Sequence, residues 1–249
     1  MANALITGAS SGIGLSTARR LAQRGHQVLL LSYDEPELLQ ACSSLGPQAV
    51  PVLCDLSMPE QVEGLWLRLE ESYGPIDTLI NNAGIGLRAE VVDTEMADLR
   101  RLFEVNFFAA ANLCRQAMAC MSRRRRGHIL NLTSAAARRS LPCIGAYGAS
   151  KAALHGLTQS LRLEASGSGV TVSEVLPISV TTPFFARAGY QPRGLTQTPE
   201  QVAEQILLCL DGGQAERTTH WPTALGFVLD ALFPNWVAAF LAWRYRRGS

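Results

Sequence analysis

The chain has 249 residues, of which 47% are hydrophobic, and its formal net charge is +1. This hydrophobic content can fill one sizeable α/β core, and a charge near zero argues against a nucleic-acid partner. We therefore expect a single domain over residues 1–249.

Short apolar runs alternate with helical segments along most of the chain. The expected strands are Ala4–Thr7, His26–Leu31, Ala49–Leu53, Ile76–Asn81, Gly127–Leu132 and Val170–Leu176. The expected helices are about Gly14–Arg24, Glu60–Tyr73, Ala97–Met121, Tyr147–Ala165 and Pro199–Leu210. Continuous apolar strands are buried on both faces, so the pattern predicts a Rossmann-type, doubly wound parallel sheet of six to seven strands with helices on both faces.

Two segments near the end of the chain depart from this alternation. Residues 177–198 are rich in proline and threonine, and a loop of this length usually has a function, here as a substrate loop. Residues 221–247 are apolar and aromatic and are interrupted by Pro222 and Pro234. They are too broken to span a bilayer.

The apolar end segment has two interpretations. It packs against the domain or a second subunit, or it forms a lid or a peripheral membrane anchor. The second interpretation rests on tryptophans beside Arg244, Arg246 and Arg247, a combination that suits a lipid headgroup boundary.

A glycine-rich turn, TGASSGIG at residues 7–14, follows the first expected strand. Glycine lets the backbone approach a diphosphate, and the free N–H groups of a helix N-terminus bind the anion. Ordinary strand-to-helix turns also use glycine, but the position after the first strand favours a dinucleotide site. The candidate contacts are Gly8, Ser10, Ser11, Gly12, Ile13 and Gly14.

Further motifs follow in order: NNAG at residues 81–84, Asn106, Ser134, and YGASK at residues 147–151. With the glycine-rich turn, they resemble the short-chain dehydrogenase/reductase family over about residues 3–185. The resemblance implies an NAD(P)(H)-dependent oxidoreductase that interconverts a carbonyl and an alcohol by hydride transfer. A non-catalytic nucleotide sensor or scaffold is the alternative, but a sensor needs neither Ser134 nor Tyr147.

The resemblance also assigns contacts to both ends of the cofactor. Asp55 would bond adenine, with Leu56 beside it, while Asn82, Ala83 and Gly84 would line the adenosine ribose side. Without the resemblance, Asp55 could equally be the N-terminal residue of a helix, and Asn82 could simply be a turn residue. Pro177 and Thr182 would meet the nicotinamide amide, although Ile178 replaces the usual glycine between them and Thr182 could instead cap a short helix before Pro183.

The choice between NAD and NADP depends on the end of the second strand. In this family NAD-dependent members usually carry an acid at the position of Ser32, and NADP-dependent members a basic residue at Ser11 or Tyr33. This chain has neither, and Asp34, Glu35 and Glu37 follow. A carboxylate at position 32 would repel the 2′-phosphate of NADP. Because Ser32 carries none, we expect a slight preference for NADP(H).

The expected catalytic residues are Ser134, Tyr147, Lys151 and Asn106. Tyr147 and Lys151 share a helix face because they are four residues apart. We expect the ammonium to lower the pKa of the Tyr147 phenol from its usual value near 10. Ser134 would orient the substrate oxygen and Asn106 would complete a proton relay, as the resemblance implies.

Lys151 is also the only lysine among 22 basic residues. Its position in the YGASK motif suggests that an ammonium is needed there, and chance is the alternative explanation.

Several absences complete the expectations. The six cysteines form no CxxC pair, so we expect a reducing compartment and no metal site. The first residues lack a signal-peptide pattern, which favours a cytoplasmic, possibly membrane-peripheral protein.

We expect a homodimer or homotetramer. We also expect an apolar substrate, because Phe184, Phe185 and Tyr190 lie on the substrate loop with Leu87, Leu141 and Cys143 expected nearby.

Overall fold

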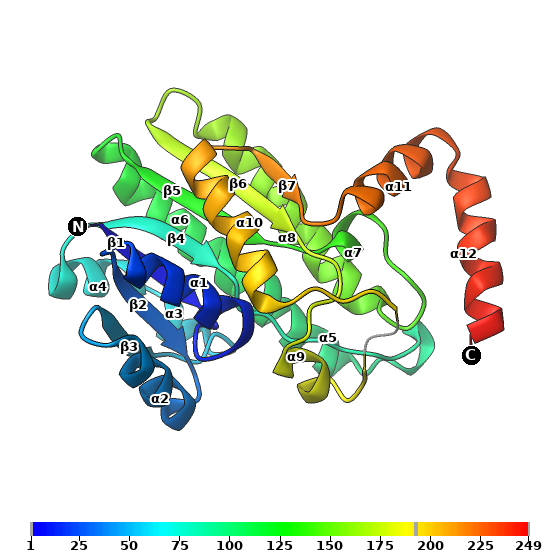
Figure 1. The fold of residues 1–249 in the computed structure, drawn as a ribbon, viewed down its shortest axis with the longest axis horizontal. Helices are drawn as coiled ribbons and strands as arrows, with labels where there is room; N and C mark the ends of the chain where they lie inside the picture. Colours follow the sequence, from blue (N-terminus) through cyan, green and yellow to red (C-terminus); the bar gives the residue numbers. More distant parts are fainter. Residues whose placement is uncertain (1, 192–193, 249) are drawn as a thin grey trace.

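The computed structural model describes residues 2–191 and 194–248, with side chains described as far as residue 244. In this part of the chain, seven strands form one parallel sheet in the order β3-β2-β1-β4-β5-β6-β7 (Figure 1). The strands are β1 (Asn3–Thr7), β2 (Gln27–Ser32), β3 (Ala49–Leu53), β4 (Ile76–Asn81), β5 (Gly127–Leu132), β6 (Val170–Leu176) and β7 (Glu216–Thr218). The predicted doubly wound parallel sheet is therefore confirmed.

Helices cover both faces of the sheet (Figure 1). The helices that pack on one face are α1 (Gly12–Gln23), α2 (Glu35–Leu45) and α10 (Pro199–Gly212). Those on the other face are α4 (Leu65–Tyr73), α6 (Ala109–Arg123) and α8 (Gly145–Glu164). Successive residues of a strand pack in the cores on opposite faces of the sheet. Leu5 belongs to one core and Ile6 to the other. This two-sided burial explains why the strands are continuously apolar.

Two predicted helices are interrupted in the structure. The helix predicted over 60–73 is divided into α3 (Pro59–Val62) and α4, because Gly64 adopts a φ of 66° between them. The helix predicted over 97–121 consists of α5 (Met96–Phe103), a π-helical turn η2 (Glu104–Phe108) and α6. A π turn inside a helix is frequently found at a functional site.

Helix α2 and strand β7 were not predicted from the sequence, nor were the short η1 (Val91–Asp93) and α7 (Ala135–Arg138). Helix α2 buries only Leu38, Ala41 and Cys42, which is a narrow apolar stripe. Strand β7 is three residues long, contains charged Glu216 and Arg217, and pairs only with β6. Weak periodicity and short length hide α2 and β7 from a pattern analysis.

The end of the chain leaves the sheet. The substrate loop, residues 177–198, contains α9 (Pro183–Arg187), and two further helices follow β7: α11 (Trp221–Leu232) and α12 (Pro234–Gly248). Figure 1 shows α12 standing away from the sheet beyond α11. Among the described residues, no helix combines the length and apolar character needed to cross a membrane. The side chains of Arg246 and Arg247 lie outside the described residues.

Candidate active site

A cavity lies at the carboxyl ends of the parallel strands. It encloses about 490 Å³. Strand order reverses between β1 and β4, and a ligand of an open α/β sheet binds in the crevice at such a reversal. Seventeen of the nineteen site residues expected from the sequence line this cavity. They are Gly8, Ser10, Ser11, Gly12, Ile13, Ser32, Tyr33, Asp55, Leu56, Asn82, Ala83, Gly84, Ser134, Tyr147, Lys151, Pro177 and Thr182.

The glycine-rich turn is shaped to admit a phosphate group. Gly8 and Gly12 adopt positive φ angles of 63° and 55°, which glycine tolerates best. A Cβ on Gly8 would lie 2.9 Å from the Ala83 backbone, so the turn leaves no room for a side chain there. Helix α1 begins at Gly12 with no side-chain cap and no acid in its first turn, so its free N–H groups can bind an anion.

Gly14, which was expected to contact the cofactor, is not among the residues that line the cavity. A Cβ on Gly14 would lie 2.3 Å from the Gly8 carbonyl oxygen and 2.6 Å from Asn82 Nδ2. Gly14 therefore permits close packing between the first helix and the glycine-rich turn.

Replacing Gly14 with alanine is expected to lower the free energy of unfolding by about 1–3 kcal/mol, because the added methyl group overpacks the turn. Gly156→Ala is the matched control, since Gly156 also lies in a helix but has nothing within 4 Å of its Cβ position. Urea denaturation would measure both. Equal stability of Gly14→Ala and wild type would contradict the packing role.

Asn82 holds the glycine-rich turn against β4. Its Nδ2 donates to the Thr7 and Gly8 carbonyl oxygens at 2.8 and 3.0 Å, and its backbone N–H donates to Thr7 Oγ1 at 3.0 Å. Asp55 has a local role too, because its Oδ1 accepts hydrogen bonds from Ser57 N and Ser57 Oγ, both at 2.8 Å. Asn82 and Asp55 therefore line the cavity and also hold its wall in place through local hydrogen bonds.

Ser134, Tyr147 and Lys151 come together at one end of the cavity. Ser134 follows β5 and caps α7 (Ala135–Arg138), accepting a hydrogen bond from Ala136 N at 3.1 Å. Tyr147 lies in the first turn of α8 and lines the cavity together with Ser134. Lys151 lies one turn later, is 3% exposed, and donates from Nζ to the Leu132 carbonyl oxygen at 2.9 Å.

Burial governs the pKa values of this group. Burial raises the pKa of Tyr147 to about 12, against an opposing contribution from the Ser134 hydrogen bond. Burial lowers the pKa of Lys151 to about 8. The net shift of the Tyr147 pKa is thus opposite to the lowering expected from the sequence, and Lys151 is not among its causes. At neutral pH the Tyr147 phenol is protonated and Lys151 is mostly an ammonium.

Asn106 is buried in the π-helical turn and does not line the cavity. Its Oδ1 accepts from Ile85 N at 2.8 Å, and its Nδ2 donates to the Ile85 carbonyl oxygen and to Ser150 Oγ, both at 3.0 Å. A Cβ on Gly84 would lie 3.2 Å from Asn106 Oδ1 and 3.3 Å from Lys151 Nζ. Asn106 therefore holds the segment after β4 in contact with Lys151.

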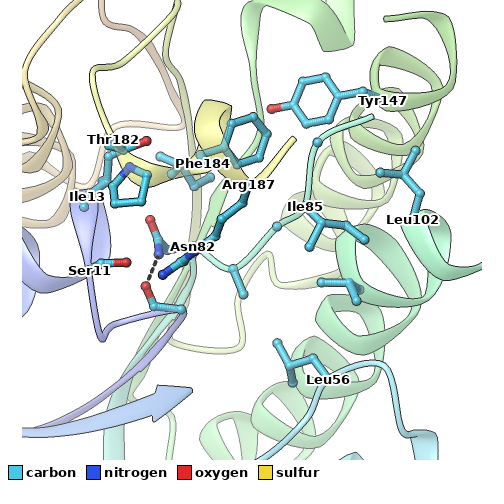
Figure 2. A pocket seen from close by; sticks show the side chains of 18 of the residues that line it. Ser11, Ile13, Leu56, Asn82, Ile85, Leu102, Tyr147, Thr182, Phe184 and Arg187 are labelled. Atoms are coloured by element: carbon cyan, nitrogen blue, oxygen red, sulfur yellow. Dashed lines mark hydrogen bonds between the residues drawn. The ribbon is translucent and has the colours of Figure 1, made fainter. Parts of the chain in front are cut away.

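The substrate loop covers the catalytic end of the cavity with aromatic rings. The rings of Tyr147 and Phe184 meet edge to face at 5.7 Å, and Phe184 and Phe185 at 5.3 Å (Figure 2). Leu87, Phe184 and Phe185 line the cavity as expected. Leu141, Cys143 and Tyr190 are not among the residues that line it.

The sequence analysis missed one cavity wall, a face of the segment from α5 into the π turn. Asp98, Arg101, Leu102 and Val105 line the cavity from there. Their spacing of three, four and seven residues is the signal that would have identified this face. Arg187 also reaches the cavity, from α9.

One titratable cluster lies outside this cavity. His155 Nδ1 contacts Glu174 Oε1 at 2.8 Å, and Glu216 completes a group whose ligand-type atoms lie within 4.8 Å of one another. The histidines show no ligand spacing in the sequence, so this cluster arises only from the contact of α8 with β6 and β7. Glu174 already accepts hydrogen bonds from His155 and Thr133.

Comparisons with known proteins agree with the geometry. Residues 2–192 match the family model described as short chain dehydrogenase. A bovine (Bos taurus) 3-ketodihydrosphingosine reductase is 33% identical over 223 residues, covering 83% of this chain and 67% of the relative.

Two solved structures share the fold and were determined with different cofactors. A short-chain dehydrogenase from Sphingobium yanoikuyae in complex with NADPH has a TM-score of 0.83 and 29% identity, covering 94% of this chain and 96% of that one. A short-chain dehydrogenase/reductase from Burkholderia phymatum in complex with NAD has a TM-score of 0.85 and 26% identity, covering 92% of each. The chain belongs to the short-chain dehydrogenase family and is an NAD(P)-dependent oxidoreductase that interconverts carbonyl and alcohol groups.

Proposed function

We propose that this enzyme acts on an apolar carbonyl or alcohol compound, with Tyr147 as the acid/base, Ser134 orienting the substrate oxygen, and Lys151 and Asn106 supporting the proton relay. The observation that carries the proposal is that Ser134, Tyr147 and Lys151 line the same cavity as the glycine-rich turn. A sensor would need the turn but not Ser134 and Tyr147.

The cavity suits a dinucleotide along its length. The first turn of α1 would hold the diphosphate, Asp55 and Leu56 the adenine end, and Lys151, Pro177 and Thr182 the nicotinamide end. Gly12 and Thr182 approach closely, because a Cβ on Gly12 would lie 3.0 Å from Thr182 Cγ2. When bound, the nicotinamide ring would supply or accept the hydride.

The chain's own residues then handle the oxygen and its proton. The Ser134 hydroxyl can donate to a substrate oxygen, which stabilises negative charge that develops there during reduction. The high pKa of Tyr147 keeps its phenol protonated at neutral pH, as a proton donor to that oxygen requires. Lys151 lies one helical turn after Tyr147 and carries a positive charge, which it loses as the pH rises above its pKa of about 8.

The substrate end of the cavity supports an apolar ligand. Ile85, Leu87, Leu102, Phe184 and Phe185 line it, and the Phe184 ring lies against Tyr147. The bovine relative is named for a keto group on a sphingoid base, which agrees with a carbonyl on an apolar chain.

A panel of ketones and alcohols, each supplied with both cofactors, tests the reaction and its substrate class. We expect purified protein to oxidise NADH or NADPH with apolar ketones faster than with small polar ones. Cofactor binding without turnover on any member of the panel would favour the sensor. Preference for charged substrates would contradict the apolar assignment.

We further propose that α11 and α12, here called the C-terminal hairpin, touch a membrane surface with anionic headgroups. Trp236, Phe240 and Trp243 stack along α12 and are 68%, 44% and 50% exposed. Exposed aromatic residues beside the basic end of the chain suit a headgroup boundary.

The base of the hairpin is tied to the catalytic end of the domain. The Arg139 guanidinium lies 3.3 Å from Asp230 Oδ1, and Arg138 stacks over the Phe227 ring at 5.3 Å. These contacts join α11 to α7, the helix that Ser134 caps. A membrane-bound hairpin would thus keep the active site near an apolar phase.

The double variant Trp236→Asp with Phe240→Asp is expected to reduce sedimentation with anionic vesicles several-fold, because two apolar anchors are lost. Leu39→Asp is the control, since Leu39 is 51% exposed on α2 at a distance from the hairpin. Size-exclusion chromatography of the same proteins separates the alternatives. If wild type ignores vesicles and the double variant only dissociates a dimer or tetramer, the hairpin is a subunit interface.

A further inference from the structure

Three acidic residues follow β2, and they have different surroundings. None of them is among the residues that line the cavity, but Glu37 contacts two that do, Ser10 and Arg187. The Asp34 carboxylate caps α2, with Oδ1 accepting from Glu37 N at 3.0 Å. Glu35 is exposed in the first turn of the same helix. Glu37 instead turns back toward the sheet, and its Oε2 accepts a hydrogen bond from Ser10 Oγ at 2.6 Å.

Ser10 joins Glu37 to the end of β2. Ser32 Oγ donates to Ser10 Oγ at 3.0 Å. Both serines line the cavity and are nearly buried, at 7% and 5% exposed. The Glu37 carboxylate is therefore attached, through one hydroxyl, to Ser32, the position at which NAD-dependent family members usually carry their own acid.

A carboxylate at this place discriminates between the two cofactors by charge. It accepts hydrogen bonds from the two hydroxyls of an unmodified ribose, and such charge-assisted bonds are the strong ones. A 2′-phosphate instead brings negative charge beside a carboxylate, and the repulsion weakens binding.

We propose that Glu37 selects NAD(H) over NADP(H) by accepting one adenosine ribose hydroxyl at Oε1, in place of an acid at Ser32. The inference rests on the proposed binding of the dinucleotide in this cavity. It reverses the preference for NADP(H) expected from the sequence, which considered only the residues at the end of the strand.

Arg187 is the positioning residue for this carboxylate. Its Nη2 contacts Glu37 Oε1 at 2.8 Å and Oε2 at 3.0 Å from α9, 150 positions later in the chain. In Figure 2 its side chain extends across the cavity toward Ser11 and Asn82. A 2′-phosphate could recruit Arg187 only by breaking this pair, which would leave Glu37 as an unpaired acid beside the phosphate.

The test measures cofactor affinity directly, by fluorescence titration of purified protein with NADH and with NADPH. We expect wild type to bind NADH more tightly. Glu37→Gln should weaken NADH binding by about ten-fold, since a charge-assisted bond is lost, and should strengthen NADPH binding. Glu35→Gln is the matched control and should leave both dissociation constants unchanged.

Arg187→Gln distinguishes the two roles of the arginine. As a positioning residue, it should weaken NADH binding less than Glu37→Gln does. Tighter binding of NADPH by wild type, lost in Arg187→Gln, would overturn the inference and make Arg187 a phosphate ligand. An unchanged NADH-to-NADPH ratio in Glu37→Gln would also overturn it. Absence of binding by either cofactor would instead contradict the proposed function itself.

Discussion

Replacing Tyr147 with phenylalanine is expected to lower kcat by about 10²–10⁴-fold, the usual contribution of a positioned acid or base. The substitution removes the hydroxyl, which is the proposed proton donor, and keeps the ring that packs against Phe184. Cofactor affinity should stay within a few-fold of wild type, because the shape of the cavity is retained.

Steady-state rates and fluorescence titration with reduced cofactor, measured together, separate the two halves of this expectation. Tyr190→Phe is the control, since Tyr190 belongs to the same aromatic cluster through Phe185 but does not line the cavity. A Tyr147→Phe variant that keeps most of its rate would show that another group supplies the proton.

Lys151→Arg should lower kcat by about 100-fold or more, although it keeps the positive charge. Lys151 is 3% exposed, and its Nζ is bonded to the Leu132 carbonyl oxygen beside Gly84. A planar guanidinium is larger than an ammonium and is not its equivalent, and displacement of catalytic groups by about 1 Å can lower a rate 100-fold. Circular dichroism melting would verify that the variant is folded.

The pH profile tests whether the charge of Lys151 matters. Burial lowers the pKa of Lys151 to about 8, so the ammonium is present below this pH and is lost above it. The wild-type rate of carbonyl reduction should therefore fall above pH 8. Arginine remains charged throughout, so this inflection should be missing from whatever rate Lys151→Arg retains. Wild-type activity in Lys151→Arg would show that the single lysine is a matter of chance.

Most of the candidate site was predictable because its motifs are local. The glycine-rich turn and the YGASK helix start each lie within eight residues, at the carboxyl end of a strand or the start of a helix. Parallel strands bring those ends to one edge of the sheet, so short motifs far apart in sequence meet in one cavity. Gly14 lies in the glycine-rich turn but packs against Gly8 and Asn82, and Asn106 is bonded to the backbone of Ile85. A motif does not reveal such contacts.

The effect of burial on the pKa of Tyr147 could be recognised only in the structure. The spacing of Tyr147 and Lys151 correctly suggested a shared helix face, yet the direction of the Tyr147 pKa shift was wrong. That expectation considered only the nearby positive charge. Burial removes water from the phenol, and this has the larger effect on the pKa of Tyr147.

The sequence by itself determined the parallel sheet, the order of its motifs and the reaction class. Continuous apolar runs predict strands buried on two faces, and helices between them impose parallel pairing. Only the tertiary structure decided what the acids after β2 do. Asp34 caps its own helix, whereas Glu37 meets Ser10 from the first turn and Arg187 from the substrate loop. Such contacts join side chains 27 and 150 positions apart, and their geometry depends on how α1, α2 and α9 pack around the cavity, which no local pattern encodes.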